Sequence, residues 1–354
     1  MSRLGDLGAR LYHGESSYDF VGKRKIWYSI SAVILVVVAA GLGLRGLNLG
    51  IEFKGGAEFQ VKTASPSVEK ARDAAESAGS GEVIVTLIGS DRVRIQTGPI
   101  DEAKSKEIAA AVGGTFGVPQ SEVRVQLVGP SWGGDITQKA LQGLGVFLLL
   151  VMIFLAVYFE PKMAVAAIVA LLHDVIITIG VYALLGLEVT PATVIGVLTI
   201  LGYSLYDTVV VFDKVRENTR GIAAQARRTY SGAANLALNQ TLVRSINTSV
   251  VALLPVVGIL VIGVGILGAG TLKDLAVSLF VGMLAGTYAS IFVATPVLAQ
   301  LKESEPAMQA LAKRVASRGG EELVTTRVAT GAGAPGVAPA GPRVQPRRQP
   351  RRKR

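Results

Sequence analysis

The sequence contains no cysteine and only two histidines, His13 and His173. The absence of cysteine excludes disulfides, cysteine-ligated zinc and a cysteine nucleophile, and two histidines are too few to favour a histidine-based metal site. We therefore expect neither a metal nor another cofactor. Charged residues are also scarce, at 18%, whereas hydrophobic residues make up 50% and the mean hydropathy is +0.46. This balance excludes an ordinary soluble protein and indicates a chain that crosses a membrane several times.

Six apolar runs are long enough to cross a bilayer as helices. The first, from Ile26 to Leu44, is too long for the apolar core of a signal peptide, and no small-residue cleavage site follows it. It is expected to be a retained span. Three residues, Glu160 to Lys162, separate the second span from the third, which predicts a tight helical hairpin. The later spans are expected at about 140–159, 163–187, 193–212, 246–267 and 275–299, within a bundle over residues 137–300.

Basic charge lies in three blocks. Lys and Arg outnumber Asp and Glu by 5 to 3 in residues 1–25, by 6 to 1 in 214–244 and by 12 to 4 in 300–354, whereas 45–135 holds 10 against 12. Because basic flanks remain in the cytoplasm, both termini and the loop 214–243 are expected there. Residues 45–136 then lie outside, between spans one and two.

This outer region alternates between strand and helix periods, in contrast to the spans around it. Ser67 is the expected N-cap of its first helix, and Gly55 and Gly56 interrupt its first strand, which indicates a bulge or a close backbone approach. The order βαββαβ predicts a ferredoxin-like sheet with two helices on one face, a fold that alone says little about function. The strands are expected over 51–63, 82–88, 92–97 and 122–128, and the helices over 67–78 and 100–112.

The tail over residues 301–354 is rich in Ala, Gly and Pro around 330–342 and ends in PRRQPRRKR. Such a composition cannot bury a core, so the tail is expected to be disordered and cytoplasmic. It either reinforces topology as a solvated segment or docks weakly on anionic lipid or the ribosome. Because no aromatic residue among the last 50 could stack on bases, no specific nucleic acid is expected.

Asp207 is the most unusual residue of the spans, because it lies inside the apolar run from Ile195 to Phe212. An ionised carboxylate at such depth costs roughly 2.5 to 3.5 kcal/mol, which favours a proton site, an ion site or a buried pair. Tyr203 and Ser204 fall on roughly the same helical face and predict a polar stripe that points into the bundle. The alternative is an aspartic acid that stays protonated and only holds two helices together.

Arg244 is the candidate basic partner of Asp207. It lies near the inner boundary, where the segment SINTSVVALLP opens the fifth span, and its side chain could extend either toward Asp207 or toward lipid phosphates. Asn247 and Thr248, in the same segment, are candidate supporting polar residues. The alternative is an ordinary interfacial arginine.

His173 and Asp174 lie close to the middle of the third span. Adjacent residues are about 100° apart on a helix, so both cannot point at one partner, but either could face the bundle interior. Histidine is rare in hydrocarbon and titrates near neutral pH, so the pair is a candidate support for proton movement or a source of interhelical hydrogen bonds.

Further charges follow Asp207 at the inner end of its helix. Asp213, Arg216 and Glu217 are interpreted as an ionic cluster, with a solvated and mutually paired helix end as the simpler explanation. An intramembrane aspartyl protease would need two carboxylates on different helices that face one water. Asp213 shares a helix with Asp207, about 240° around it, and only Asp174 offers a second acid elsewhere.

Several motifs resemble the SecF family, the smaller half of the SecD/SecF translocase accessory complex. They occur in family order over residues 20–300. In sequence they are GIEFKGG at 50–56 (with glutamate at position 52, where the family usually has aspartate), VGPSWGGDI at 128–136, LLHDV at 171–175, GYSLYDTVVVFDKVREN at 202–218 and NQTLVRSINTSV at 239–250.

The resemblance implies a subunit that works with SecD and the SecYEG channel in the bacterial plasma membrane. It implies use of the proton motive force to complete translocation of preproteins, with Asp207 and Arg244 as a proton relay and no catalytic residue. The sequence lacks a GxxxxGK[ST] motif, so ATP is not its expected energy source. Two alternatives remain, a structural subunit that stabilises the channel without proton coupling and an RND-like exporter of small molecules.

Overall fold

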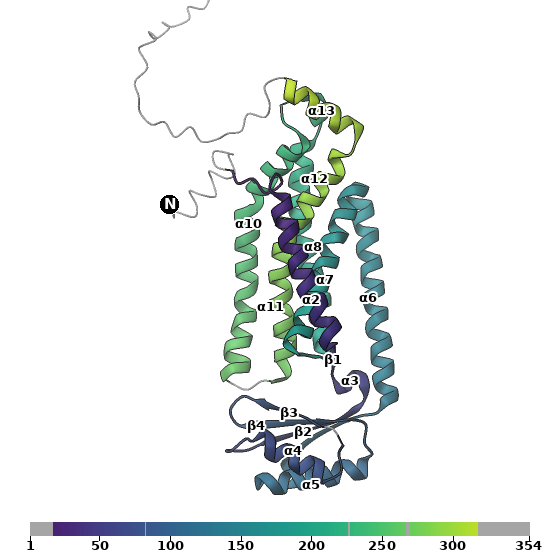
Figure 1. Ribbon diagram of the computed structural model, residues 1–354, viewed down its shortest axis with the longest axis vertical. Helices are drawn as coiled ribbons and strands as arrows, with labels where there is room; N and C mark the ends of the chain where they lie inside the picture. Colours follow the sequence, from purple (N-terminus) through teal and green to yellow (C-terminus); the bar gives the residue numbers. More distant parts are fainter. Residues whose placement is uncertain (1–16, 82, 226, 267–269, 318–354) are drawn as a thin grey trace, which may run out of the picture.

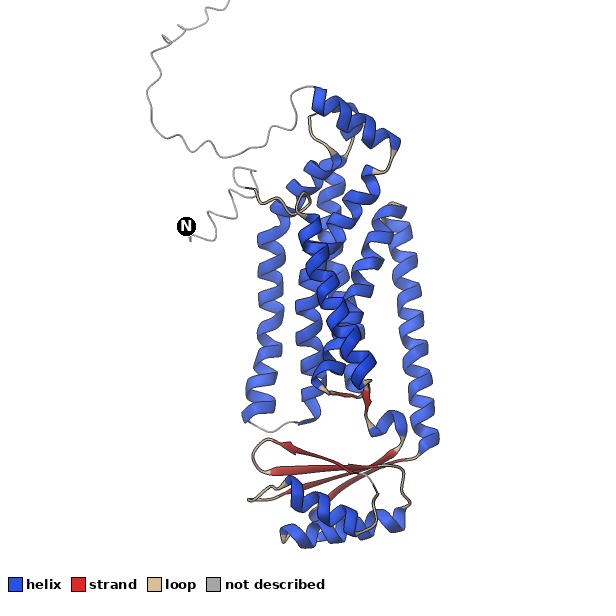
Figure 2. Cartoon of the chain, viewed as in Figure 1, coloured by secondary structure: helices blue, strands red, loops and turns tan. Residues whose placement is uncertain are grey.

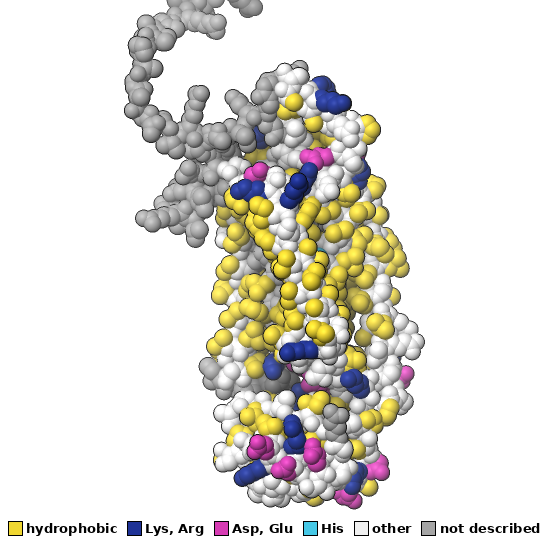
Figure 3. Space-filling view, viewed as in Figure 1, with side chains coloured by type: hydrophobic (Ala, Val, Ile, Leu, Met, Phe, Trp, Pro, Cys, Tyr) yellow, Lys and Arg dark blue, Asp and Glu magenta, His cyan; other side chains and the backbone are white. Residues whose placement is uncertain are grey.

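The protein consists of a long helical bundle and a small α/β head at one end of it (Figure 1). The computed structural model describes residues 17–317 except 82, 226 and 267–269. The termini of this described part lie at the end of the bundle opposite the head. Apolar side chains cover the helices, whereas charged side chains gather on the head and at the far end (Figure 3). This distribution is typical of a bundle whose middle lies in hydrocarbon.

Six helical stretches of the described residues are long and apolar enough to cross a membrane, which confirms the predicted fold class. Pro130, Pro161 and Pro191 each lie in the first turn of a helix. Backbone N–H groups there have no partner within the helix, so proline costs no hydrogen bond. Two stretches continue through π-helical segments, η2 (Ile259–Ile266) and η3 (Ser290–Ala294). The long helices are α2 (Arg24–Arg45), α6 (Pro130–Tyr158), α7 (Pro161–Leu185), α8 (Pro191–Thr219), α10 (Tyr230–Gly258) and α11 (Gly270–Ala289), with α12 (Thr295–Glu303) extending the last.

The head has the predicted βαββαβ order, with both helices on one face of its sheet (Figure 2). Its four antiparallel strands lie in the order β3-β4-β2-β5, and their inward residues form a core of their own under the helices. Ser67 caps the first helix by accepting a hydrogen bond from the Lys70 amide, as predicted. The bounds are β2 (Gly56–Lys62), α4 (Val68–Ser77), β3 (Val83–Ile88), β4 (Arg92–Thr97), α5 (Glu102–Phe116), η1 (Gln120–Glu122) and β5 (Arg124–Val128).

The first strand is shorter than predicted, because its start is a helical turn, α3 (Ile51–Lys54). Gly55 and Gly56 follow with φ of 79° and 145°, a backbone region that residues with a Cβ rarely adopt. A Cβ at Gly55 would lie 2.9 Å from the Cα of Pro130. The two glycines therefore let the chain leave α3, pass close to the start of α6 and enter the sheet.

A short parallel strand pair joins the ends of two membrane helices beside the head. β1 (Asn48–Leu49) follows α2 and pairs with β6 (Glu188–Val189), which lies between α7 and α8. The Gly50 amide extends this pairing by donating to the Val189 carbonyl at 2.9 Å. The pair places Glu188 next to the chain segment that enters the head.

The far end of the bundle is more helical than the sequence suggested. Helix α8 continues to Thr219 and α10 begins at Tyr230, after the short α9 (Ile222–Gln225), so most of segment 214–243 is helix and not loop. The Thr229 side chain caps α10, and the alanine-rich turns that follow have high helix propensity.

The expectation of a disordered tail was wrong for its first part. Helix α13 (Pro306–Ser317) forms because Leu311 and Val315, one turn apart, are buried against Ile222 and Ala233. The rest of the predicted disordered tail, residues 318–354, lies outside the described residues.

Small residues allow α11 to approach α8 closely. A Cβ at Gly282 would lie 2.4 Å from a side-chain atom of Ile200, and one at Gly286 would lie 2.8 Å from the Cβ of Ser204. The GxxxG pair thus packs against α8, and Gly286 lies beside the predicted polar stripe.

We expect Gly286→Ala to destabilise the bundle, because its new methyl group would press on Ser204 and force the helices apart. Overpacking of this kind costs about 1 to 3 kcal/mol. Thermal unfolding in detergent measures the effect, and Gly143→Ala in α6 is the matched control, because nothing lies within 4 Å of its added Cβ. Equal melting temperatures for the two variants would contradict the close approach.

Candidate functional site

Asp207 lies in the bundle interior, where it joins three helical segments. Its side chain is only 5% exposed. Ser245 of α10 donates a hydrogen bond to Oδ1 at 2.7 Å, and Ser290, the first residue of η3, donates to Oδ2. Both partners are neutral hydroxyls that are themselves buried. The site therefore offers hydrogen bonds to the carboxyl group, and no Lys or Arg of the described residues forms an ion pair with it.

The π-helical segment η3 explains how Ser290 reaches Asp207. Pro296 lacks the N–H that would bond the carbonyl of Phe292 in a regular helix, so the backbone relaxes there into a wider turn. The Ser290 hydroxyl also lies 3.2 Å from the Thr287 carbonyl. Ser290 thus has two alternative acceptors, one of them the carboxyl of Asp207.

Arg244 does not form the predicted ion pair with Asp207 in the part of the chain that the structure describes. Its side chain is exposed, and one guanidinium nitrogen lies 3.4 Å from the Tyr206 hydroxyl. The reason is helical geometry, since Ser245 faces Asp207 and the preceding residue is rotated by about 100°. Arg244 and Tyr206 instead lie together on the outer surface of the bundle.

His173 and Asp174, either of which was expected to be able to face the bundle interior, are both buried in α7. Ser204 of α8 donates to Asp174 Oδ2, and His173 Nδ1 lies 3.7 Å from Asp174 Oδ1. The imidazole also stacks on Tyr288 of α11 at 5.8 Å between ring centroids. Both residues are interior because α7 is covered on two sides, by α2 and by α8 with α11.

The remaining predicted residues divide into two groups. Tyr203 donates to Ser249 at 3.1 Å, and Ser249 bonds Thr287 at 2.7 Å, so Tyr203 belongs to a second polar chain between α8, α10 and α11. Asn247 is exposed and Thr248 half-buried, and within the described residues neither bonds Asp207. The supporting role predicted for these two residues rests on no contact in the structure.

The acids proposed for an aspartyl protease, Asp174 and Asp207, have separate hydroxyl partners on their neighbours. Within the described residues no hydrogen bond joins the two carboxyl groups. At the end of α8, Lys214 pairs with Glu217 at 2.9 Å, while Arg216 reaches the Tyr158 carbonyl at 3.5 Å and Asp213 is exposed. This helix end is solvated, as the simpler explanation predicted.

A polar junction between head and bundle was missed by the sequence analysis. Arg94 of β4 binds Glu58 of β2 at 2.6 Å and Glu188 of β6 at 2.8 Å, with the three side chains 18%, 8% and 11% exposed. Gln96 donates to Glu188 at 2.6 Å. Alternation places these residues on the sheet face opposite α4 and α5, so that face is directed at the bundle. Nothing in the sequence indicated that Glu188 would meet residues about 90 positions earlier.

Glu52 of α3 lies beside this junction with its Oε2 atom buried and without a hydrogen-bond partner among the described residues. Burial raises the pKa of Glu52, and the nearby negative charges of Glu188 and Glu58 raise it further. The junction holds more carboxyl groups than Arg94 can balance.

Comparison with known proteins places these features in one family. Residues 108–304 match the model described as protein export membrane protein SecD/SecF, C-terminal, which is more than half of the chain, and residues 40–67 match the SecD/SecF GG motif. The chain belongs to the SecD/SecF family. The second match contains α3 and the two glycines that precede the sheet.

Curated relatives of this chain include SecF subunits. The chain is 56% identical to the protein translocase subunit SecF of Streptomyces coelicolor, over 90% of this chain and 86% of the relative. It is 44% identical to that of Mycobacterium tuberculosis, over 90% and 75%. This chain is therefore on the SecF side of the family, a multi-pass membrane protein of the protein translocase group.

The fold also matches the crystal structure of SecDF, a translocon-associated membrane protein from Thermus thermophilus. The TM-score is 0.72 at 29% identity, over 82% of this chain. The chain spans only 39% of the length of that SecDF chain. The match confirms the SecF-like architecture of six spans and one head.

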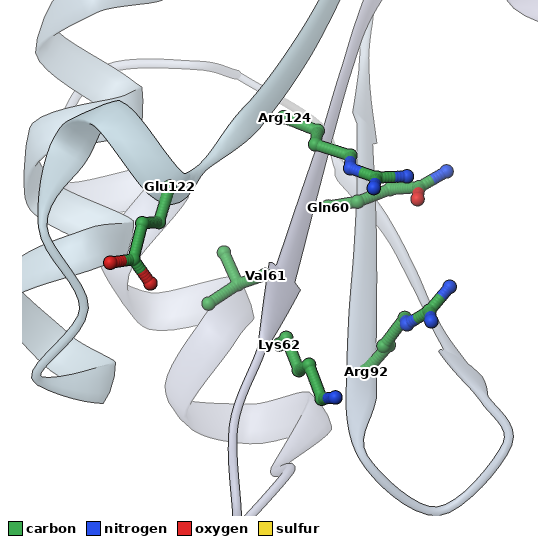
Figure 4. Close-up of a pocket in the computed structure, with 6 residues that line it drawn as sticks. All are labelled: Gln60, Val61, Lys62, Arg92, Glu122 and Arg124. Atoms are coloured by element: carbon green, nitrogen blue, oxygen red, sulfur yellow. The ribbon is translucent and has the colours of Figure 1, made fainter.

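A pocket in the head belongs to the same sheet face as the junction (Figure 4). Gln60, Lys62, Arg92 and Arg124 extend to one side of the sheet, whereas Val61 and Glu122 point to the other. Gln60 lies opposite Arg94 in the sheet register. The bundle-facing surface of this SecF-like head is therefore basic around the pocket, whereas at Arg94 it meets the acids Glu58 and Glu188.

We expect Glu52→Gln to raise stability at neutral and alkaline pH. Because the pKa of Glu52 is higher in the folded than in the unfolded state, the folded protein binds this proton more tightly, and wild-type stability falls as pH rises from about 4.5 through the folded pKa. The variant has no carboxyl at position 52, so it does not lose stability in this way as pH rises. Its melting temperature should exceed the wild-type value by a few degrees at pH 8, and the two should converge below pH 4.

The matched control is Glu102→Gln. Glu102 is fully exposed, and its hydrogen bond with Lys106 lowers its pKa. Any change in melting temperature from Glu102→Gln should therefore be small and opposite in sign to that from Glu52→Gln. A Glu52→Gln melting temperature equal to or below wild type at pH 8 would contradict the buried carboxyl.

Proposed function

We propose that this SecF-like chain works with SecD to use the proton motive force in completing the translocation of preproteins across the bacterial plasma membrane. The observation that carries the proposal is the Asp207 carboxyl, buried in the bundle and bonded to two neutral hydroxyls on different segments. Membership in a family of protein export membrane proteins supplies the process that it would serve.

The surroundings of Asp207 favour a change of protonation. An ionised carboxylate accepts from both serines, and an ionised acid inside an apolar span is in general costly. A protonated Oδ2 must donate, so Ser290 has to turn its own hydrogen elsewhere, and the Thr287 carbonyl at 3.2 Å is in reach. Proton binding would thus rearrange the contact between α8 and η3.

The energy available matches such a rearrangement. One proton that crosses 100 mV releases about 2.3 kcal/mol, enough to bias two arrangements of a helical bundle. No catalytic role is proposed for this chain, since its acids have separate partners and its relatives are named as translocase subunits.

The orientation in the membrane follows from charge and shape together. Lys23, Arg24 and Lys25 lie at the start of α2, and basic residues of α12 and α13 lie at the same end of the bundle, opposite the head (Figure 1). Under the positive-inside rule this end and both termini are cytoplasmic and the head is outside. The domain limits drawn from the sequence, 1–25, 26–44, 45–136, 137–300 and 301–354, are proposed on this basis.

Polar side chains on the outer surface support SecD as a partner. Arg244, Tyr206 and Asn247 are exposed on α8 and α10 at positions that would otherwise meet lipid. Exposed arginine and asparagine are unfavourable there, which favours cover by partner helices. We propose that SecD helices cover this patch, and that the SecYEG channel and the preprotein are further partners. The basic tail remains a candidate contact for anionic lipid or the ribosome.

We expect Asp207→Asn to abolish the part of preprotein translocation that depends on the proton gradient, because asparagine keeps the size of the side chain but binds no proton. Its amide oxygen can still accept from one serine, whereas its amide nitrogen can only donate to the other. Translocation is measured in membrane vesicles that contain this chain, SecD and the channel, with and without an uncoupler. The control is Asp213→Asn, an exposed acid on the same helix, which should behave as wild type.

The outcomes separate the alternatives. Full stimulation by the gradient in assembled Asp207→Asn would overturn proton coupling through this residue. Loss of assembly with SecD would instead favour the structural subunit, and export of a small molecule without the channel would favour the RND-like exporter.

We expect a photo-crosslinking residue at Asn247 to capture SecD in the membrane. The same residue at Val157 of α6, which is 84% exposed, is the control and should be captured far less or only by lipid. Mass spectrometry of the product identifies the partner chain. Capture at Val157 but not at Asn247 would place the SecD surface elsewhere.

A further inference from the structure

The pair His173 and Asp174 contains the least satisfied polar atoms of the bundle. Both imidazole nitrogens and Asp174 Oδ1 are buried and have no hydrogen-bond partner among the described residues. The two side chains are 5% and 0% exposed. Buried polar atoms are nearly always bonded, so three such atoms in one place mark a site with capacity for a further hydrogen-bonded proton.

The net charge of the pair depends on how many protons it holds. Their nearest atoms lie 3.7 Å apart, close enough for an ion pair. With one shared titratable proton the pair is neutral overall, either as imidazolium with carboxylate or as imidazole with carboxylic acid. A second proton makes it positive, and the loss of the first makes it negative. Either net charge is costly in an apolar interior and interacts strongly with other charges there.

Ser204 connects this pair with Asp207. Its hydroxyl donates to Asp174 Oδ2, and its backbone position is three residues before Asp207 on α8. Residues three apart lie on the same helical face, so the two acids lie about one turn apart along the bundle interior. Gly286 packs on Ser204 and keeps its side chain in this position.

No lysine or arginine forms an ion pair with the His173–Asp174 pair in the part of the chain that is described. On α8, Ser204 faces the pair and Asp207 follows one turn later. Tyr203 is bonded to Ser249 and not to the pair. From α11 the Tyr288 ring stacks on the imidazole, and the Tyr288 hydroxyl is itself bonded to Ser31 of α2. On α8, Asp207 is therefore the titratable group one turn from the residue that bonds Asp174.

We propose that His173 and Asp174 form a second proton-binding site of the bundle, whose occupancy depends on the protonation of Asp207. The proposal deepens the proposed proton coupling and rests on it for its biological use. Proton binding at one site makes and breaks no covalent bond elsewhere in the chain. It changes the charge that the other site meets across Ser204.

The two histidines of the sequence make the pair directly observable. In a His13→Gln background, His173 is the single imidazole, and nitrogen NMR of the ¹⁵N-histidine-labelled full chain in lipid nanodiscs reports its protonation from pH 4 to 9. Asp174→Asn and Asp207→Asn should each lower the titration midpoint of His173, the first by about one pH unit or more, which is tenfold in proton affinity. Ser204→Ala should weaken the response to Asp207→Asn.

The control is Ser278→Ala, a buried serine that bonds its own helix and should leave the midpoint unchanged. The same midpoint in wild type and Asp207→Asn, or an imidazole that stays neutral throughout, would overturn the proposal. If Asp174→Asn does not fold, Asp207→Asn and Ser204→Ala still decide it on the intact pair.

This measurement needs no export activity, so the two proposals fail separately. If gradient-dependent translocation survives Asp207→Asn, the proposed function is overturned. The coupling between Asp207 and the His173–Asp174 pair can still be measured in that case. An unresponsive His173 would remove the second site alone.

Discussion

The bond between Asp207 and two serine hydroxyls is the interaction on which the rest of the bundle depends. Ser245 and Ser290 come from two different segments that both follow α8 in the chain, α10 and η3, and each donates to one oxygen of the carboxyl. Neutral donors hold the carboxyl in place without fixing its charge, whereas a buried cation would fix it. An acid held in this way can take part in proton exchange and still keep its helices together.

Close packing of small residues makes this arrangement possible. Gly282 and Gly286 let α11 approach α8, and the segment η3 that follows α11 then places Ser290 within reach of Asp207. The π-helical turn at Ser290, next to Pro296, then directs the hydroxyl inward. Helix packing in a membrane depends on such contacts, because lipid is as apolar as the side chains and so provides no hydrophobic driving force for helix association. The same features that bring the helices together therefore build the site.

The head is connected to the bundle by polar groups and two chain crossings. Its apolar core is complete under α4 and α5, and its bundle-facing surface meets β6 through Arg94, Gln96 and Glu188. Polar interfaces between domains separate more readily than apolar ones. A head attached in this way can change position over the membrane while the stem at Gly55 and Pro130 keeps it in place, which suits a subunit of the export machinery.

The sequence alone determined the six spans, the βαββαβ head and the depth of Asp207, because each depends on hydropathy or on a local repeat within a few residues. Motif order was sufficient for the SecF resemblance that the comparisons confirmed. Only the tertiary structure decided which side chains meet. It turned Arg244 outward, since Ser245 takes the inward position, and it brought Ser290 to Asp207 and Glu188 to Arg94 across 83 and 94 residues. Such contacts depend on how helices rotate and pack against each other, and a single sequence carries no local signal for that.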